Sequence, residues 1–137
     1  MRVALDTNVL VSAVATRGLC ADVLNLVLAE HEIIVGETVL GELKRVLRER
    51  IRVPVHVVAE VDALMRQEAT VIPKAGPLRV SIRDKSDVAV LSEAVAGRTE
   101  CLVTGDKDLL ELAIAAPVQV MTPRTFWEQL RRAPRGR

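Results

Sequence analysis

The chain has 137 residues, of which 50% are hydrophobic and 27% are charged, and its formal net charge is +1 at pH 7. This size predicts one packed domain, and this composition excludes a disordered chain. No apolar run approaches the roughly 20 residues that cross a bilayer, and no signal-peptide pattern is found, so we expect a cytoplasmic protein without a membrane partner. Cys20 and Cys101 lie in apolar surroundings without metal-ligand spacing, which favours reduced, buried thiols.

Strands and helices are predicted to alternate along the chain. Short apolar runs predict strands at residues 2–5, 33–35, 70–72, 101–103 and 118–120. Apolar residues at helical spacing predict helices that begin near residue 9 and then span 19–30, 37–50, 54–68, 84–96, 106–115 and 123–132. Gly97 is expected in a left-handed conformation at the end of helix 84–96. Residues 73–83 are predicted to be the longest irregular stretch. This order predicts a three-layer α/β/α fold with a short, mainly parallel central sheet.

Acidic residues follow two of the predicted strands. Asp6 comes after the first strand and Asp106 after the fourth, while Asp84 and Asp87 begin the helix that precedes the fourth strand. The carboxyl ends of parallel strands are where such sheets bind ligands. Each acid alone is equally well explained as a helix cap, which is worth roughly 0.3 to 1 kcal/mol through the helix dipole.

Several converging carboxylates need a different explanation. Two unit charges about 5 Å apart repel by roughly 3 kcal/mol at an effective dielectric near 20, so a shared cation is expected. Oxygen ligands favour Mg²⁺ or Mn²⁺. Glu42 is a further candidate because it borders the apolar stripe of helix 37–50. Asp108 is either a supporting group or a solvent-exposed residue.

Four short motifs then resemble the PIN-domain family. They are Asp6-Thr7-Asn8, Glu42 in the third helix, Asp87 at the head of an apolar helix, and Thr104-Gly105-Asp106-Lys107-Asp108. Within that family the chain resembles the toxin components of toxin-antitoxin pairs, which are related to the VapC-type ribonucleases. The resemblance covers nearly the whole chain, so we expect one PIN-like domain at residues 1–133 and a basic C-terminal tail at residues 134–137. One departure is that Asp84 and Asp87 offer two acids where many members have one.

The resemblance implies an endoribonuclease that uses Mg²⁺ or Mn²⁺ to hydrolyse RNA phosphodiester bonds. Carried over residue by residue, the catalytic and metal-binding residues are Asp6, Glu42, Asp87 and Asp106. The expected supporting residues are Asn8, Thr104, Asp84 and Asp108. Basic side chains suit contact with the RNA backbone, although a solvated helix face explains them as well; they are Lys44, Arg45, Arg48 and Lys107. A cognate antitoxin protein and a homodimer are the other partners that the family implies.

Two alternatives stay open at this point. One is a non-catalytic PIN-fold module that binds RNA or protein, which absence of Mn²⁺ binding would favour. The other is an RNA-processing nuclease outside any toxin-antitoxin pair. A small DNA-binding protein encoded beside this gene would favour the toxin instead.

Overall fold

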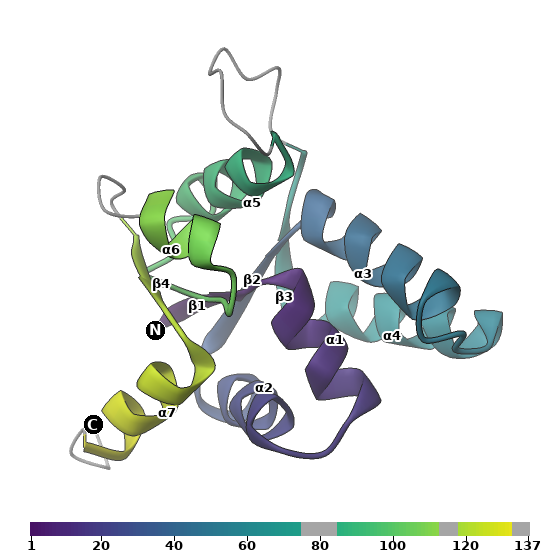
Figure 1. The fold of residues 1–137 in the computed structure, drawn as a ribbon, viewed down its shortest axis with the longest axis horizontal. Helices are drawn as coiled ribbons and strands as arrows, with labels where there is room; N and C mark the ends of the chain where they lie inside the picture. The colour runs from purple at the N-terminus through teal and green to yellow at the C-terminus, as the bar shows by residue number, and fades with distance from the viewer. Residues whose placement is uncertain (75–84, 113–117, 133–137) are drawn as a thin grey trace.

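A five-stranded parallel sheet forms the centre of the computed structural model, which describes the chain except residues 75–84, 113–117 and 133–137 (Figure 1). The strands are β1 (Arg2–Leu5), β2 (Glu32–Gly36), β3 (Ala69–Ile72), β4 (Cys101–Val103) and β5 (Gln119–Met121). The helices are α1 (Thr7–Ala15), α2 (Leu19–Glu30), α3 (Glu37–Glu49), α4 (Val55–Glu68), α5 (Lys85–Ala96), α6 (Lys107–Leu112) and α7 (Pro123–Arg132). The predicted α/β fold with a parallel sheet is confirmed.

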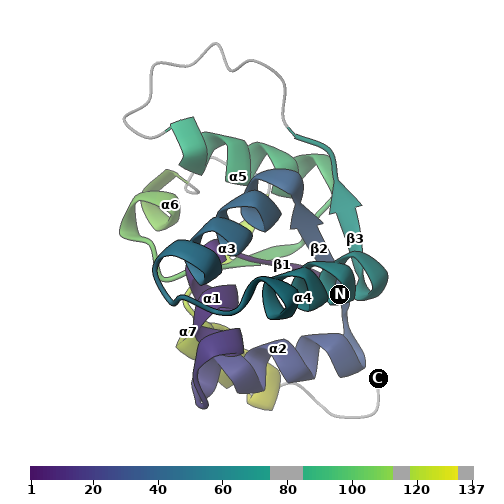
Figure 2. The same cartoon turned by 90° about the vertical axis from the view of Figure 1, so that its right-hand side faces the viewer.

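The sheet has the order β3-β2-β1-β4-β5, and helices cover both of its faces. Figure 2 shows α5 and α6 on one side of the sheet and α2, α4 and α7 on the other. This arrangement follows from right-handed crossovers, because the chain moves outward from β1 to β3 and then returns to β4 on the other side of β1. The three central strands are therefore almost wholly buried, as their continuous apolar sequences require.

Register brings the ends of β1 and β4 side by side. Leu5, the last residue of β1, pairs with Val103, the last residue of β4. Asp6 and Thr104, which follow these strands, therefore lie at the same edge of the sheet. The Asp6 amide donates to the Val103 carbonyl at 2.9 Å. The strand order also reverses between β1 and β4, and this switch point is where open α/β sheets usually bind ligands.

Local sequence explains where several helices begin. Asp6 caps α1 by accepting from the Thr7 amide at 2.8 Å. Thr122 caps α7, with its hydroxyl accepting from the Thr125 amide, and Pro123 occupies the first helical position. The apolar stripe of α3 is buried as predicted; it consists of Val39, Leu40, Leu43, Val46 and Leu47. The predicted positions of these helices hold to within a residue or two.

The expectation for Gly97 is wrong. Arg98, and not Gly97, has the left-handed conformation, with φ of 54°. The Thr99 amide donates to the Ala94 carbonyl and the Arg98 amide to the Val95 carbonyl, which forms a Schellman motif with Arg98 as its left-handed residue. Gly97 is required for a different reason, since a Cβ there would lie 2.5 Å from Ile34 Cγ2.

The structure places the two cysteines differently, since only one of the two predicted buried thiols is fully buried. Cys101 is buried, Cys20 is half-buried, and both are free thiols. Within the described residues, no single helix is long and apolar enough to cross a membrane, and α1 and α2 satisfy that test only as a pair bent by 102°.

Candidate active site

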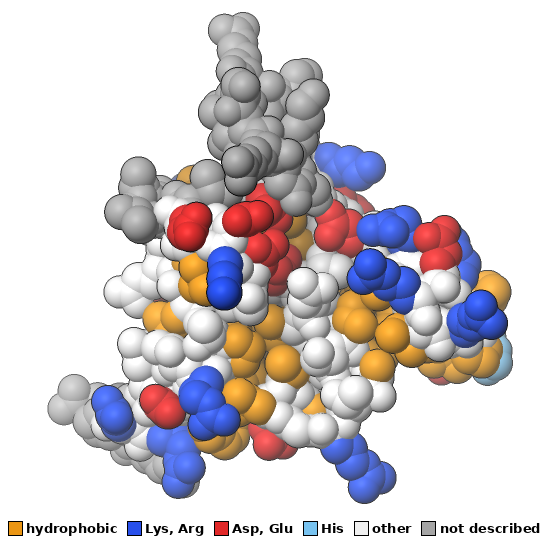
Figure 3. Space-filling view, in the orientation of Figure 1, with side chains coloured by type: hydrophobic (Ala, Val, Ile, Leu, Met, Phe, Trp, Pro, Cys, Tyr) orange, Lys and Arg blue, Asp and Glu red, His pale blue; other side chains and the backbone are white. Residues whose placement is uncertain are grey.

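Four carboxylates from different parts of the chain line one cleft at the carboxyl edge of the sheet. The cleft has a volume of about 360 Å³ and is lined by Asp6, Thr7, Asn8, Glu42, Arg45, Asp87, Val90 and Asp106. Figure 3 shows acidic side chains gathered between α6 and α3, with basic side chains over α3. The structure thus brings together all four residues that the sequence predicted as catalytic. Their chemical roles stay predictions.

Asp6 is the most deeply buried of the four, with 5% of its surface exposed. Its Oδ1 accepts from the Thr7 amide and its Oδ2 accepts from the Thr104 hydroxyl, both at 2.8 Å. Burial raises the pKa of the Asp6 carboxyl above its ordinary value, and the nearby charges of Asp106 and Glu42 raise it further. The two hydrogen bonds act in the opposite direction but do not cancel the rise.

Thr104 connects the two strand ends. This fully buried side chain donates its hydroxyl hydrogen to Asp6, and its oxygen accepts from the Asp106 amide at 3.0 Å. Thr7 provides a second connection, because its hydroxyl donates to Glu42 Oε2 at 3.1 Å. A continuous set of hydrogen bonds therefore joins the Asp106 backbone, Asp6 and Glu42. Thr7 was not among the predicted site residues, although it lies inside the Asp6-Thr7-Asn8 motif.

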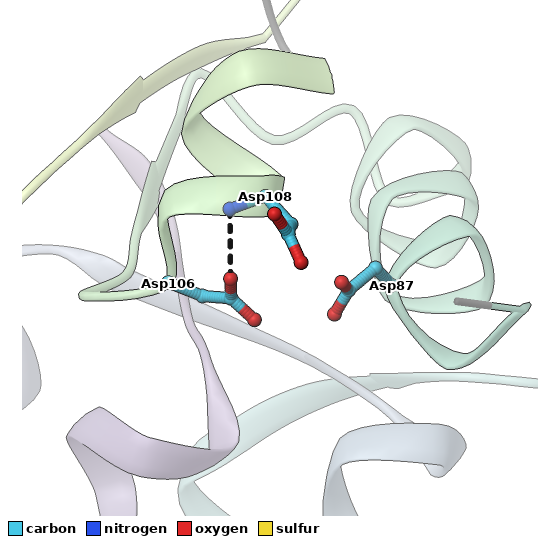
Figure 4. A group of neighbouring side chains, drawn as sticks. All are labelled: Asp87, Asp106 and Asp108. Carbon is cyan, nitrogen blue, oxygen red and sulfur yellow. Dashed lines mark hydrogen bonds between the residues drawn. The ribbon is translucent and has the colours of Figure 1, made fainter. Parts of the chain in front are cut away.

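Asp108 lies closer to the acidic centre than its exposed position suggested. Carboxylate oxygens of Asp87, Asp106 and Asp108 all lie within 4.8 Å of one another. In Figure 4 the Asp87 and Asp108 side chains point toward each other across a gap beside Asp106, whose Oδ1 accepts from the Asp108 amide at 2.8 Å. The sequence alone left Asp108 open between a supporting and an exposed residue; the structure shows an exposed side chain beside Asp87 and Asp106, and a supporting role stays a prediction.

The donor set fits a hard divalent cation. Opposite ligands of one Mg²⁺ are about 4 Å apart, since each Mg–O distance is 2.0 to 2.1 Å, so the spacing of the three carboxylates requires only small side-chain movements. Carboxylate oxygens with no nearby thiol or imidazole in the described cleft favour Mg²⁺ or Mn²⁺ over zinc. A cation there would also offset the repulsion that raises the pKa of Asp6.

The predicted RNA-binding residues have different surroundings. Arg45 lines the cleft and is 3.9 Å from Glu49, whereas Lys44 contacts Asp62 of α4 at 3.5 Å. Arg48 is exposed and lies 3.8 Å from Glu49, and Lys107 is exposed at the start of α6. Among the supporting residues, Asn8 lines the cleft, while Asp84 lies outside the described residues. Of the predicted basic residues, Arg45 thus lines the acidic cleft, and Lys107 directly follows the cleft residue Asp106 in the chain.

One buried acid of α5, Glu93, was not among the site residues predicted from the sequence. Glu93 is 2% exposed, and its carboxylate accepts from the Thr38 amide at 2.8 Å and from the Thr38 hydroxyl. The available signal was a charged residue within an apolar helical stretch. Its partner at the start of α3 could not be identified without the tertiary structure.

Comparisons with known proteins agree with this architecture. The family model described as "PIN domain" matches residues 2–108, which include all four cleft carboxylates. The crystal structure of VapBC2 from Rickettsia felis, bound to a DNA fragment from its promoter, is similar in fold, with a TM-score of 0.64. Sequence identity is 19%, and the match covers 88% of this chain and 97% of that chain. A comparison with curated protein sequences found no significant match. The extent of the family match shows that this chain belongs to the PIN-domain family, whose members are generally nucleases.

Proposed function

We propose that this protein is a divalent-metal-dependent endoribonuclease that hydrolyses RNA phosphodiester bonds and acts as the toxin of a toxin-antitoxin pair. The observation that carries the proposal is the meeting of Asp6, Glu42, Asp87 and Asp106 in one cleft. Capping explains Asp6, Asp87 or Asp106 alone, but it does not explain why four separate segments bring carboxylates together against their mutual repulsion. Membership of a family of nucleases supports the same reaction.

The residues of the cleft divide into those that would hold a metal and those that orient them. Asp87, Asp106 and Asp108 would hold the ion together with Asp6 or Glu42. When bound, Mg²⁺ or Mn²⁺ would supply a Lewis acid that activates water and neutralises charge on the phosphate. Thr104 orients Asp6 and Thr7 orients Glu42 through their hydroxyl groups. Arg45 and Lys107 suit the phosphate backbone of RNA on either side of the acids.

Cleavage of RNA by the purified protein tests the reaction directly. We expect cleavage that requires Mg²⁺ or Mn²⁺ and stops with a chelator. Asp6→Asn and Asp106→Asn should each lower kcat/KM by about a hundredfold or more, because a lost ligand weakens charge stabilisation by the metal. Single-stranded DNA of the same sequence should be run in parallel to define the substrate class.

Asp22→Asn is the matched control, since Asp22 is an exposed acid in the first turn of α2, outside the cleft. It should cleave RNA like the wild type. Equal activity in Asp6→Asn, Asp106→Asn and wild type would assign the cleavage to a contaminant or another site. A wild-type protein that binds RNA but neither binds Mn²⁺ nor cuts would instead be a non-catalytic module.

The toxin role needs its own test. The structure that is similar in fold is that of VapBC2 bound to a DNA fragment from its promoter, which supports an antitoxin as partner here. We expect growth arrest when this chain is expressed alone and rescue when the neighbouring small reading frame is co-expressed. Growth arrest without any rescuing neighbour would favour an RNA-processing nuclease. The homodimer and the cytoplasmic location stay predictions, which size measurement in solution and cell fractionation test.

A further inference from the structure

Two helices set the width of the acidic cleft. Glu42 comes from α3, and Asp87 and Val90 come from α5, so the placement of one helix against the other controls how far apart the two carboxylates lie. Thr38 lies four residues before Glu42, which places both side chains on the same face of α3. The contact between Thr38 and Glu93 therefore lies one turn from the cleft.

The start of α3 has no capping side chain of its own. Gly36 occupies the N-cap position and makes no side-chain hydrogen bond to the first turn. Glu93 of α5 performs that task from outside, because its carboxylate accepts from both the Thr38 amide and the Thr38 hydroxyl. A negative charge is also favoured there by the dipole of α3. A Cβ on Gly36 would lie 2.8 Å from Glu93 Cβ, so the glycine leaves the space that Glu93 fills.

We propose that Glu93 is a positioning residue for the nuclease site, which fixes Glu42 of α3 relative to Asp87 of α5. Glu93 is 2% exposed and is not among the residues that line the cleft, so it acts through these two helices and not on substrate. A buried carboxylate with two donors from one residue gives a directional contact, which an apolar pair of the same size would not. The inference rests on the proposed function, since it concerns the geometry of the same metal site.

Removing the carboxylate tests this role. In Glu93→Ala the Mn²⁺ dissociation constant, measured by calorimetry, should rise about tenfold, as expected when groups behind a metal site are lost. The kcat for RNA cleavage should fall by about tenfold or more, because the carboxylates of Glu42 and Asp87 would no longer be held in the correct relative position. The KM should be nearly unchanged. Glu93→Gln should stay within about twofold of wild type in both, since its carbonyl oxygen still accepts from the Thr38 amide and its amide group donates to the Thr38 hydroxyl.

A control of similar stability separates positioning from stabilisation. Phe126→Leu weakens the core at α7, which packs against α2 and not against α3 or α5 to any comparable extent in the described structure. If Phe126→Leu lowers the Tm as much as Glu93→Ala does, it should still keep the Mn²⁺ affinity and the kcat of the wild type. If Glu93→Ala matches Phe126→Leu in both measurements, Glu93 only stabilises the fold and the inference is wrong.

A second variant covers the case in which Glu93→Ala does not fold. Thr38→Val removes the hydroxyl but keeps the amide, so it should weaken Mn²⁺ binding and kcat by a smaller factor, about threefold, while Thr38→Ser restores both. No change in Thr38→Val would then overturn the inference. Failure of the proposed function looks different, because the wild-type protein itself would neither bind Mn²⁺ nor cut RNA.

Discussion

At the scale of single residues, the acidic cleft is a place where function opposes stability. Asp6 is buried beside Asp106 and Glu42, and the pKa of its carboxyl is raised by that burial and by those charges. Hydrogen bonds from Thr104 and Thr7 keep the side chain in place but do not remove the cost. Such residues are retained for what they bind, so replacing them commonly stabilises a protein.

We therefore predict that Asp6→Asn is more stable than wild type at pH 7 in the absence of metal, by about 1 kcal/mol, a usual size for such substitutions. A raised folded-state pKa means that the folded protein holds the proton more tightly, so the contribution of Asp6 to stability is lost as pH rises through that pKa. Denaturant unfolding of both proteins, with chelator present, measures this difference in stability. It should be carried out at pH 7 and at a pH below about 3.9, which is the pKa of Asp in the unfolded chain. The advantage of Asp6→Asn should shrink at the lower pH; a less stable variant at pH 7 contradicts the argument.

At the scale of elements, helix ends in this protein depend on neighbours as much as on local sequence. α1 and α7 are capped by their own preceding residues, Asp6 and Thr122, and both starts were predictable. α3 is capped by Glu93 from another helix, and no local pattern indicates this. At the end of α5 the local pattern predicted the wrong residue, because the glycine serves packing against β2 and the arginine takes the left-handed conformation.

The end of α5 yields a pair of opposite predictions at adjacent positions. Gly97→Ala should destabilise the fold by about 1 to 3 kcal/mol, since its Cβ would overlap Ile34 and approach Ile72 within 3.0 Å. Arg98→Gly should stabilise it by about 1 kcal/mol, because glycine adopts a φ of 54° without steric cost. Thermal unfolding of both variants checks the pair. Stabilisation by Gly97→Ala would contradict the argument, because it would show that packing against Ile34 and Ile72 does not require a glycine at this position.

At the scale of the whole molecule, the topology places the candidate site. β1 and β4 are neighbours in the sheet although about a hundred residues separate them in the chain, as the pairing of Val3 with Cys101 shows. Crossovers in opposite directions leave the carboxyl ends of β1 and β4 open to solvent between α3, α5 and α6. Asp6 and Asp106 follow these two strands, and α3 and α5 supply Glu42 and Asp87. Binding of a cation at this junction would link helices from both faces of the sheet.

Metal binding should consequently stabilise the entire domain. At a Mn²⁺ concentration of a hundred times the dissociation constant, the free energy of unfolding should rise by about 2.7 kcal/mol. Thermal unfolding with Mn²⁺ and with chelator measures the change. Asp106→Asn should gain much less under the same conditions, and an equal gain in that variant would place the ion elsewhere.

The sequence by itself determined the α/β fold and the parallel sheet, because these depend on local patterns, and its resemblance to the PIN-domain family indicated the four cleft carboxylates. Short apolar strands, amphipathic helices such as α3, and acids after strand ends are all properties of neighbouring residues. Only the tertiary structure decided that Asp108 joins Asp87 and Asp106, that Thr7 holds Glu42, and that Glu93 caps α3. Those contacts connect segments far apart in sequence, and their geometry arises from strand register and helix packing, which no single segment specifies.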